Sequence, residues 1–347
     1  MSQNKANYEI EKDAMQSIER SGIDINSFKG KTVLVTGGTG FFGIWFLTCL
    51  VIIKEKIGND LRIITISRSS EKFALNVRDK KLLNNIEILK GDIKEIELDN
   101  IKVTHLVHMA TTNASETFGG EDQLAKIELL FEGTKNILKQ CGPTLEKVLF
   151  TSSGVAYGIN NKNRISESDF TGPNTIDTGS ALGIGKLTAE YLVSYFSKKY
   201  EYKYSIARCF SFAGQYLPLE LHYAFGNFIN DLLQNKNIQV RGDGQDIRSY
   251  LYIGDAIAWL IKLLDDPNNS IYNVGSENEV KIEALARKIA SHKTGIEAVI
   301  EGGGKQVDNF KRPSYIPDTN KIKSRYPNLI EWTELEAIVE KMLAPSR

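Results

Sequence analysis

The stretch KTVLVTGGTGFFG (31–43) decides the fold. A β-branched run leads into three spaced glycines, Gly37, Gly40 and Gly43, and an apolar run follows them. Such a turn between a strand and a helix brings backbone N–H groups and the helix N-terminus onto a pyrophosphate, where side chains would block the approach. The stretch therefore predicts a dinucleotide site, and the competing interpretation is a turn with a structural role alone.

The runs that come next extend this unit into a parallel sheet. RIITISR (62–68), IEILKGD (86–92), THLVHMA (104–110) and KVLFTSS (147–153) are short apolar runs separated by helical segments. Such alternation is typical of a parallel sheet covered by helices on both faces. We therefore predict an α/β fold with a Rossmann-like, doubly wound parallel sheet.

The order of predicted strands and helices divides the chain into three parts. Residues 1–30 are an N-terminal helical extension that packs against the domain or a second subunit, and residues 31–207 are the dinucleotide-binding domain. Residues 208–347 form a smaller C-terminal α/β substrate-binding lobe, in which 217–233 reads as helical and some segments cross back to the first domain.

Composition excludes several classes of function. The 347 residues carry 43 basic and 43 acidic side chains, so nothing predicts binding to nucleic acid or to an anionic membrane. The three cysteines are scattered and the four histidines form no ligand cluster, which predicts reduced thiols and no metal. The apolar run 41–53 is too short to cross a bilayer, and the first residues lack the apolar core of a signal peptide. We expect a cytoplasmic protein.

The ends of the later strands indicate which dinucleotide binds. Ser67, Arg68 and Ser69 follow the second strand, where an NAD-preferring protein usually places an acid. A guanidinium with two hydroxyls suits a 2′-phosphate, so we favour NADP(H), with NAD(H) as the alternative; Arg68 could also be a solvated loop residue. Asp92 can accept from the adenine amino group. The further cofactor contacts that we predict are Thr39, Phe41, Phe42, Ile93, Met109, Ala110, Thr111, Thr151 and Phe210.

Several motifs in sequence order resemble one family. Besides TGGTGFFG they are GDI (91–93), EGTKNIL (132–138), FTSSGVAYG (150–158), GIGKLTAE (183–190) and GDGQDIRSYLYIGD (242–255). Together they resemble the extended short-chain dehydrogenase/reductases, the NAD(P)-dependent nucleotide-sugar epimerase/dehydratase family, from about Lys31 to the last helix. The resemblance implies a nucleoside-diphosphate sugar as substrate and a homodimer.

The resemblance also implies which residues are catalytic. Ser153 would hydrogen-bond the sugar oxygen where hydride is gained or lost, and Lys186 would bind the nicotinamide ribose and lower the pKa of a neighbouring acid. The family's tyrosine, four residues before that lysine, is Leu182 here, which cannot transfer a proton. Because acid–base groups contribute ~10²–10⁴ in rate, we consider three explanations. Another acid acts (Ser153 with a water, Tyr157 or Thr111), the leucine is a natural or engineered loss of function, or the protein binds its ligands without turnover.

The residues after Ser153 bear on the reaction. The family's 4,6-dehydratases and decarboxylases place an Asp or Glu there, whereas this chain has Gly154 and Val155. We therefore expect an epimerase first and a 4-keto sugar nucleotide reductase second. A cofactor- and sugar-binding pseudoenzyme is the rival from another class.

The resemblance places the substrate mainly in the second lobe. Asn227 would contact a phosphate oxygen, Arg248 and Arg312 would clamp the diphosphate, and surface salt bridges are the alternative for both arginines. Gln215 and Ser211 depart from the family pattern near the sugar. The substrate contacts that we predict are Thr112, Ser153, Gly154, Ser211, Asn227, Val240, Arg248 and Arg312, with Arg241 as a second candidate for the base.

Overall fold

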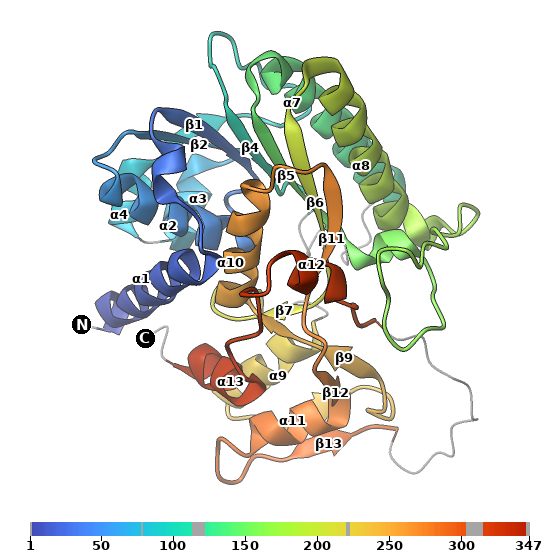
Figure 1. Cartoon of the computed structure of the whole chain (residues 1–347). Coiled ribbons are helices and arrows are strands. Elements are labelled where there is room, and N and C mark those ends of the chain that lie inside the picture. The colour runs from blue at the N-terminus through green and yellow to red at the C-terminus, as the bar shows by residue number, and fades with distance from the viewer. Residues whose placement is uncertain (1, 78, 113–121, 220–222, 303–314, 345–347) are drawn as a thin grey trace.

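The protein is described by a computed structural model that covers residues 2–77, 79–112, 122–219, 223–302 and 315–344. A seven-stranded sheet with the order β11-β6-β5-β4-β1-β2-β3 lies at its centre (Figure 1). All neighbours in this sheet are parallel. The strands are β1 (Lys31–Thr36), β2 (Leu61–Ser67), β3 (Glu87–Lys90), β4 (His105–His108), β5 (Lys147–Ser153), β6 (Lys203–Cys209) and β11 (Ser270–Val274). The strand order reverses between β1 and β4, which is where ligands bind in open sheets of this type.

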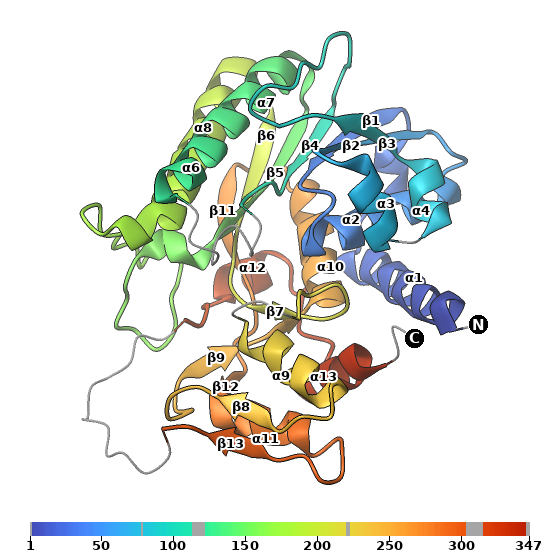
Figure 2. The ribbon, with the colours of Figure 1, turned by 180° about the vertical axis from the view of Figure 1, so that it is seen from behind.

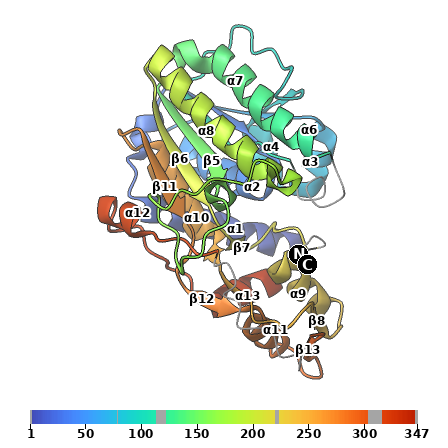
Figure 3. The same cartoon turned by 90° about the vertical axis from the view of Figure 1, so that its right-hand side faces the viewer.

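Helices cover both faces of the sheet (Figure 3). The side chains of β1 show why, because Val33 and Val35 join the core on one face and Leu34 joins the core on the other. The first face is covered by α2 (Phe41–Lys56) and α10 (Ile253–Leu264), and the second by α7 (Thr134–Cys141) and α8 (Ala181–Tyr200). The predicted α/β fold is confirmed. Among the described residues this part also contains the α-helices α1 (Ser2–Ser21), α3 (Ser70–Val77), α4 (Lys80–Asn85) and α6 (Gln123–Glu128).

The N-terminal extension packs against its own chain. Helix α1 lies against α2 and α10 (Figure 2). The Ser17 hydroxyl donates to the carbonyl oxygen of Gly254 at 2.7 Å, and Arg20 pairs with Asp255 at 3.0 Å. The expected helix is therefore present and contacts the domain.

A smaller lobe lies beyond the carboxyl end of the sheet (Figure 1). It contains three two-stranded pairs, β10 with β7, β12 with β9 and β13 with β8. Strand β11 belongs to the central sheet, as expected of a segment that crosses back, while the boundary at 207 and 208 stays a prediction. The elements of this lobe are β7 (Phe212–Ala213), α9 (Ala224–Leu233), β8 (Ile238–Val240), β9 (Ile247–Ser249), β10 (Leu251–Tyr252), β12 (Glu279–Lys281), α11 (Ile282–Ala290), β13 (Ala298–Ile300) and α13 (Leu335–Leu343). Helix α12 (Asn320–Arg325) packs instead against β11 of the central sheet.

One helix begins later than the sequence pattern predicts. We expected helix from residue 217, but α9 begins at Ala224 with Tyr223 as its N-cap. Pro218 explains part of the difference, because proline has no N–H and disfavours helical backbone in the residue before it.

Two searches of the described residues bear on membranes and metals. None of their helices combines the length and the apolar character needed to cross a bilayer. Among the same residues, no group of three or more His, Cys, Asp or Glu side chains is placed to hold a metal ion.

Candidate active site at the carboxyl edge of the sheet

The glycine turn joins β1 to the N-terminus of α2. Gly37 has a φ of +70°, and a Cβ built on it would lie 2.7 Å from the carbonyl carbon of Met109. A Cβ on Gly43 would lie 2.3 Å from the Gly37 carbonyl oxygen. Gly40 is the N-cap of α2 and has no side chain to cap the helix. The backbone therefore leaves the helix end open to an anion, which fits the pyrophosphate of a dinucleotide.

The aromatic residues of this turn face the second lobe. Phe42 packs edge-on against Phe212, with ring centroids 4.8 Å apart, and Phe41 packs against Phe42 at 5.5 Å. Thr39 beside them is half-buried. Phe42 therefore packs the turn against β7 of the second lobe, and Phe41 supports Phe42.

The end of β2 presents Arg68 to solvent between two serines. The Ser67 hydroxyl is buried, donates to the carbonyl oxygen of Ser69 at 3.0 Å and accepts from its N–H at 3.2 Å. Arg68 is exposed. The Ser67 hydroxyl thus holds the backbone of this loop, from which Arg68 projects at the surface.

The ends of β3 and β4 complete this side of the site. Asp92 accepts from the N–H of Lys94 at 2.9 Å, and Ile93 is buried. Met109 is also buried, while Ala110 is half-buried and its N–H donates to the Thr36 hydroxyl at 3.2 Å. The two threonines that come next in the chain differ, because Thr111 is exposed and Thr112 is buried.

Lys186 reaches β5 from α8. Its Nζ donates to the carbonyl oxygen of Thr151 at 2.7 Å and lies 5.0 Å from the centroid of the Phe150 ring. Burial lowers the pKa of Lys186 to about 8. The ammonium group is therefore bound to the backbone of Thr151, which precedes Ser153 by two residues in β5. Leu182 lies one helical turn before Lys186 on α8 and is half-buried.

A buried ion pair fixes α8 on the sheet. Arg208 donates to both carboxylate oxygens of Glu190, at 2.9 and 2.7 Å, and Ser152 donates to the same carboxylate at 2.5 Å. The pair connects α8 with β5 and β6 one turn beyond Lys186. This carboxylate, four residues after the lysine in sequence, is a positioning group rather than a proton donor.

One of the alternative acids does not fit the site. The hydroxyl of Tyr157 donates to Asn273 Oδ1 at 2.6 Å, and the ring has no exposed surface. Thr111, another alternative, is exposed beyond the end of β4 and stays a prediction. The expectation that Tyr157 could serve as the acid is wrong, because its hydroxyl is directed into the core.

The structure brings a tyrosine to Ser153 that the sequence analysis missed. The hydroxyl of Tyr315 lies 3.5 Å from Ser153 Oγ, which also accepts from the N–H of Val155 at 3.3 Å. The Tyr315 ring packs against Phe210 with centroids 4.9 Å apart. The sequence predicted a role for nearby Arg312 but none for Tyr315, because nothing in the local sequence indicates the contact with a residue 162 positions earlier.

The predicted substrate residues are spread over the second lobe. Asn227 is half-buried on α9, and Ser211 is half-buried next to Phe210. Arg248 on β9 donates to the carbonyl oxygen of Ile247 at 2.8 Å and lies 3.7 Å from Asp246. The Arg248 side chain is 34 % exposed.

The remaining predictions for this lobe have mixed outcomes. Val240 has no exposed surface, so its side chain belongs to the core between β8 and the helices, whereas Arg241 is exposed. Gln215 accepts from the Tyr252 hydroxyl at 3.0 Å and supports the lobe from within. Arg312 lies outside the described residues.

Comparison with known proteins gives the family context. The model of the NAD dependent epimerase/dehydratase family matches residues 33–275. The dTDP-D-glucose 4,6-dehydratase of Dictyostelium discoideum is 28% identical over 279 residues, which are 74% of this chain and 61% of that protein. The UDP-N-acetyl-alpha-D-glucosaminuronate decarboxylase of Bacillus cytotoxicus is 26% identical over 88% of this chain and 95% of that protein.

A solved structure shares the fold. The UDP-glucuronic acid 4-epimerase of Bacillus cereus, in complex with UDP-glucuronic acid and NAD, superimposes with a TM-score of 0.70. It is 20% identical, and the match covers 90% of this chain and 97% of that one. The similar proteins thus include a dehydratase, a decarboxylase and an epimerase.

Proposed function

Because the chain belongs to the NAD dependent epimerase/dehydratase family, we propose that it is a nucleotide-sugar epimerase that acts by hydride transfer at a sugar carbon. The observation that carries the proposal is the pairing of Ser153 with Gly154 at the end of β5, where no carboxylate stands beside the hydroxyl. Elimination of water or handling of a carboxylated sugar would use such a carboxylate, whereas hydride transfer at a carbinol carbon does not.

The residues present fit a nicotinamide dinucleotide. The glycine turn would receive its pyrophosphate, and Lys186 would lie near the nicotinamide ribose. When bound, this cofactor supplies and accepts hydride. The Ser153 hydroxyl would hydrogen-bond the sugar oxygen, while Arg248 and Asn227 would bind the diphosphate in the second lobe.

The choice of cofactor separates two candidate reactions. The exposed guanidinium of Arg68 favours NADP(H), which a 4-keto reductase would consume, whereas the Bacillus cereus epimerase contains NAD. We retain NADP(H) as the proposal, with the reductase as the second candidate function. The homodimer and the cytoplasmic location stay predictions.

Product mass tests the proposed reaction. The purified protein is incubated with NAD⁺ or NADP⁺ and with uridine, thymidine, cytidine and guanosine diphosphate sugars, and the products are separated by chromatography with mass detection. An epimer keeps the mass of its substrate, a dehydratase product lacks one water, and a decarboxylase product lacks carbon dioxide. A reductase instead consumes NADPH with a 4-keto sugar nucleotide. Loss of water or of carbon dioxide would contradict the proposal, and ligand binding without any turnover would identify a pseudoenzyme.

A binding measurement tests the cofactor. Arg68→Ala should weaken NADP(H) binding by about 1.5–3 kcal/mol and leave NAD(H) binding nearly unchanged, because a charge-assisted hydrogen bond to the 2′-phosphate is lost. Calorimetry of both cofactors on both proteins measures this. An equal loss for the two cofactors, or an unsubstituted protein that prefers NAD(H), would contradict the NADP(H) proposal.

A further inference from the structure

Tyr315 presents a phenol at the hydroxyl on which the proposed reaction depends. Its oxygen is 3.5 Å from Ser153 Oγ, at the outer limit of a hydrogen bond, and the side chain is half-buried. Tyrosine is a recognised general acid and base, and a candidate must lie within hydrogen-bond reach of the proton that it transfers. A sugar oxygen that hydrogen-bonds Ser153 would therefore lie close to this phenol as well.

The space around the Tyr315 hydroxyl exists because residue 154 is glycine. A Cβ on Gly154 would lie 2.9 Å from the Tyr315 oxygen and 3.0 Å from the Phe210 ring. A carboxylate side chain at this position would therefore displace the phenol. Gly154 therefore has two consequences: it leaves no carboxylate beside Ser153 for an elimination, and it leaves room for the Tyr315 hydroxyl.

The segment 315–319, which we call the strap, is held on both sides. Its Ile316 carbonyl oxygen accepts from the N–H of Ile165 at 2.9 Å, and the N–H of Asp318 donates to the Ile165 carbonyl oxygen at 2.8 Å. Asn273 Nδ2 donates to the carbonyl oxygens of Ile165 and Asp318, at 2.8 and 3.0 Å. These bonds fix the backbone immediately after Tyr315.

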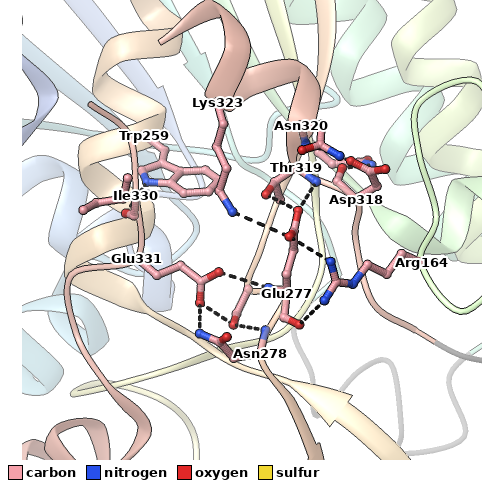
Figure 4. A network of polar contacts seen from close by, with 12 residues as sticks. Arg164, Trp259, Glu277, Asn278, Asp318, Thr319, Asn320, Lys323, Ile330 and Glu331 are labelled. Atoms are coloured by element: carbon pink, nitrogen blue, oxygen red, sulfur yellow. Dashed lines mark hydrogen bonds and ion pairs between the residues drawn. The ribbon is translucent and has the colours of Figure 1, made fainter. Parts of the chain in front are cut away.

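A carboxylate fastens the far end of the strap (Figure 4). Glu277 Oε1 accepts from both the N–H and the hydroxyl of Thr319 at 2.6 Å, and its other oxygen pairs with Arg164 at 3.1 Å. Lys323 lies 3.8 Å from the same oxygen. Burial alone would raise the pKa of Glu277, but the Thr319 hydrogen bonds together with the charges of Lys323 and Arg164 outweigh it, and the pKa is lowered. The ionised carboxylate of Glu277 thus holds the strap at Thr319, and the strap in turn fixes the position of Tyr315.

We propose that Tyr315 is the catalytic residue that exchanges a proton with the sugar oxygen, in the role that Leu182 cannot fill. The inference rests on the proposed function. When the carbonyl carbon of the sugar gains hydride, the O–H bond of Tyr315 breaks and a new O–H bond forms on the sugar oxygen. The electron pair of the broken bond stays on the phenolate. In the reverse direction the sugar hydroxyl returns its proton to the phenolate as its carbon loses hydride.

The environment of Tyr315 suits the reducing half of this exchange, in which the phenol donates its proton. Burial raises its pKa to about 12, although the hydrogen bond with Ser153 opposes the shift. The phenol therefore carries its proton at neutral pH and is ready for the step that reduces the carbonyl. Tyr157, the other phenol of this cluster, is already committed to Asn273.

The test compares Tyr315→Phe with a matched control. Tyr315→Phe keeps the ring that packs on Phe210 and removes the hydroxyl alone. Tyr202→Phe removes another buried hydroxyl, which donates to the Val193 carbonyl oxygen at 2.8 Å. Tyr202 directly precedes β6, so it lies at the amino-terminal end of the sheet, away from Ser153. We expect Tyr315→Phe to lower kcat by ~10²–10⁴. Its KM, and its dissociation constants for the cofactor and uridine diphosphate, should stay within about threefold, well below the tenfold that 1.4 kcal/mol represents. Tyr202→Phe should keep the parent kcat.

Leu182→Tyr provides the rescue. In the Tyr315→Phe protein it should restore at least a tenth of the parent kcat, because the new phenol lies one helical turn before Lys186. A merely structural role for Tyr315 would predict no rescue.

The outcomes separate this inference from the proposed function. If the parent protein is active and Tyr315→Phe is equally active, the role of Tyr315 is wrong and the function stands. If the parent is inert and Leu182→Tyr alone creates turnover, Tyr315 is not a proton donor and a missing residue explains the inactivity. If neither protein turns over any sugar nucleotide in the panel while both bind uridine diphosphate, the proposed function fails and this inference fails with it.

Discussion

At the scale of single residues, Lys186 gives the site a charge that depends on pH. Burial lowers its pKa from an ordinary 10.5 to about 8, so the ammonium form is present below pH 8 and is lost above it. If this charge assists a neighbouring phenol, kcat should fall as the pH rises through about 8 and should be level below it. Initial rates at saturating substrate between pH 6 and 10 measure this.

The free energy of unfolding should depend on pH in a different way from kcat. Between about 8 and 10.5 the unfolded chain binds the Lys186 proton and the folded chain does not, so this group makes the protein more stable as the pH rises. A fall in rate without a fall in the melting temperature would therefore report the charge itself. Lys186→Met should be slow at every pH, and a parent rate that stays level up to pH 10 would contradict the role of the ammonium group.

At the scale of elements, the close approach of α8 to the end of β5 depends on a glycine. A Cβ on Gly183 would lie 2.8 Å from the carbonyl oxygen of Val155, which is backbone of the turn after Ser153. A Cβ on Gly185 would lie 2.7 Å from the tip of the Leu130 side chain, which can rotate away. Gly183 thus faces backbone, which cannot move aside easily, and Gly185 faces the end of a side chain.

This difference predicts opposite results for two equal substitutions. Alanine in place of a helical glycine adds about 1 kcal/mol of stability where nothing opposes it. Gly185→Ala should therefore be neutral or stabilising and active. Gly183→Ala should lose about 1–2 kcal/mol, since overpacking against backbone exceeds the helical gain, and should lower kcat because α8 shifts away from Ser153. Urea unfolding and the epimerase assay measure both effects, and indistinguishable variants would show that the contact yields at no cost.

At the scale of the whole molecule, sequence reasoning succeeded where the pattern was local. Strand runs bounded by turns predicted β1 to β5, and the glycine spacing predicted the turn into α2, because each signal lies within about ten residues. Tyr315 could not be found this way, since its partner is 162 positions away and the strap depends on the path of the chain through the second lobe. Tyr157 was misjudged for the same reason, because only the tertiary structure shows that Asn273 takes its hydroxyl.

Asp255 of α10 connects α1 and the C-terminal segment at 332–333 to its own helix, and its substitution should destabilise all three. Its buried carboxylate accepts from Arg20 of α1 at 3.0 Å and from the N–H groups of Trp332 and Thr333 at 3.0 and 2.8 Å. Asp255→Ala should lower the free energy of unfolding by about 3 kcal/mol, because buried donors lose their acceptor. Asp265→Ala, which removes the half-buried partner of Lys147, should cost at most about 1 kcal/mol. Urea midpoints at equal protein concentration compare the two variants. Equal losses would mean that Asp255 does not join the N-terminal helix and the C-terminal segment to α10, and that the other contacts of α1, among them the Ser17–Gly254 hydrogen bond, hold it in place.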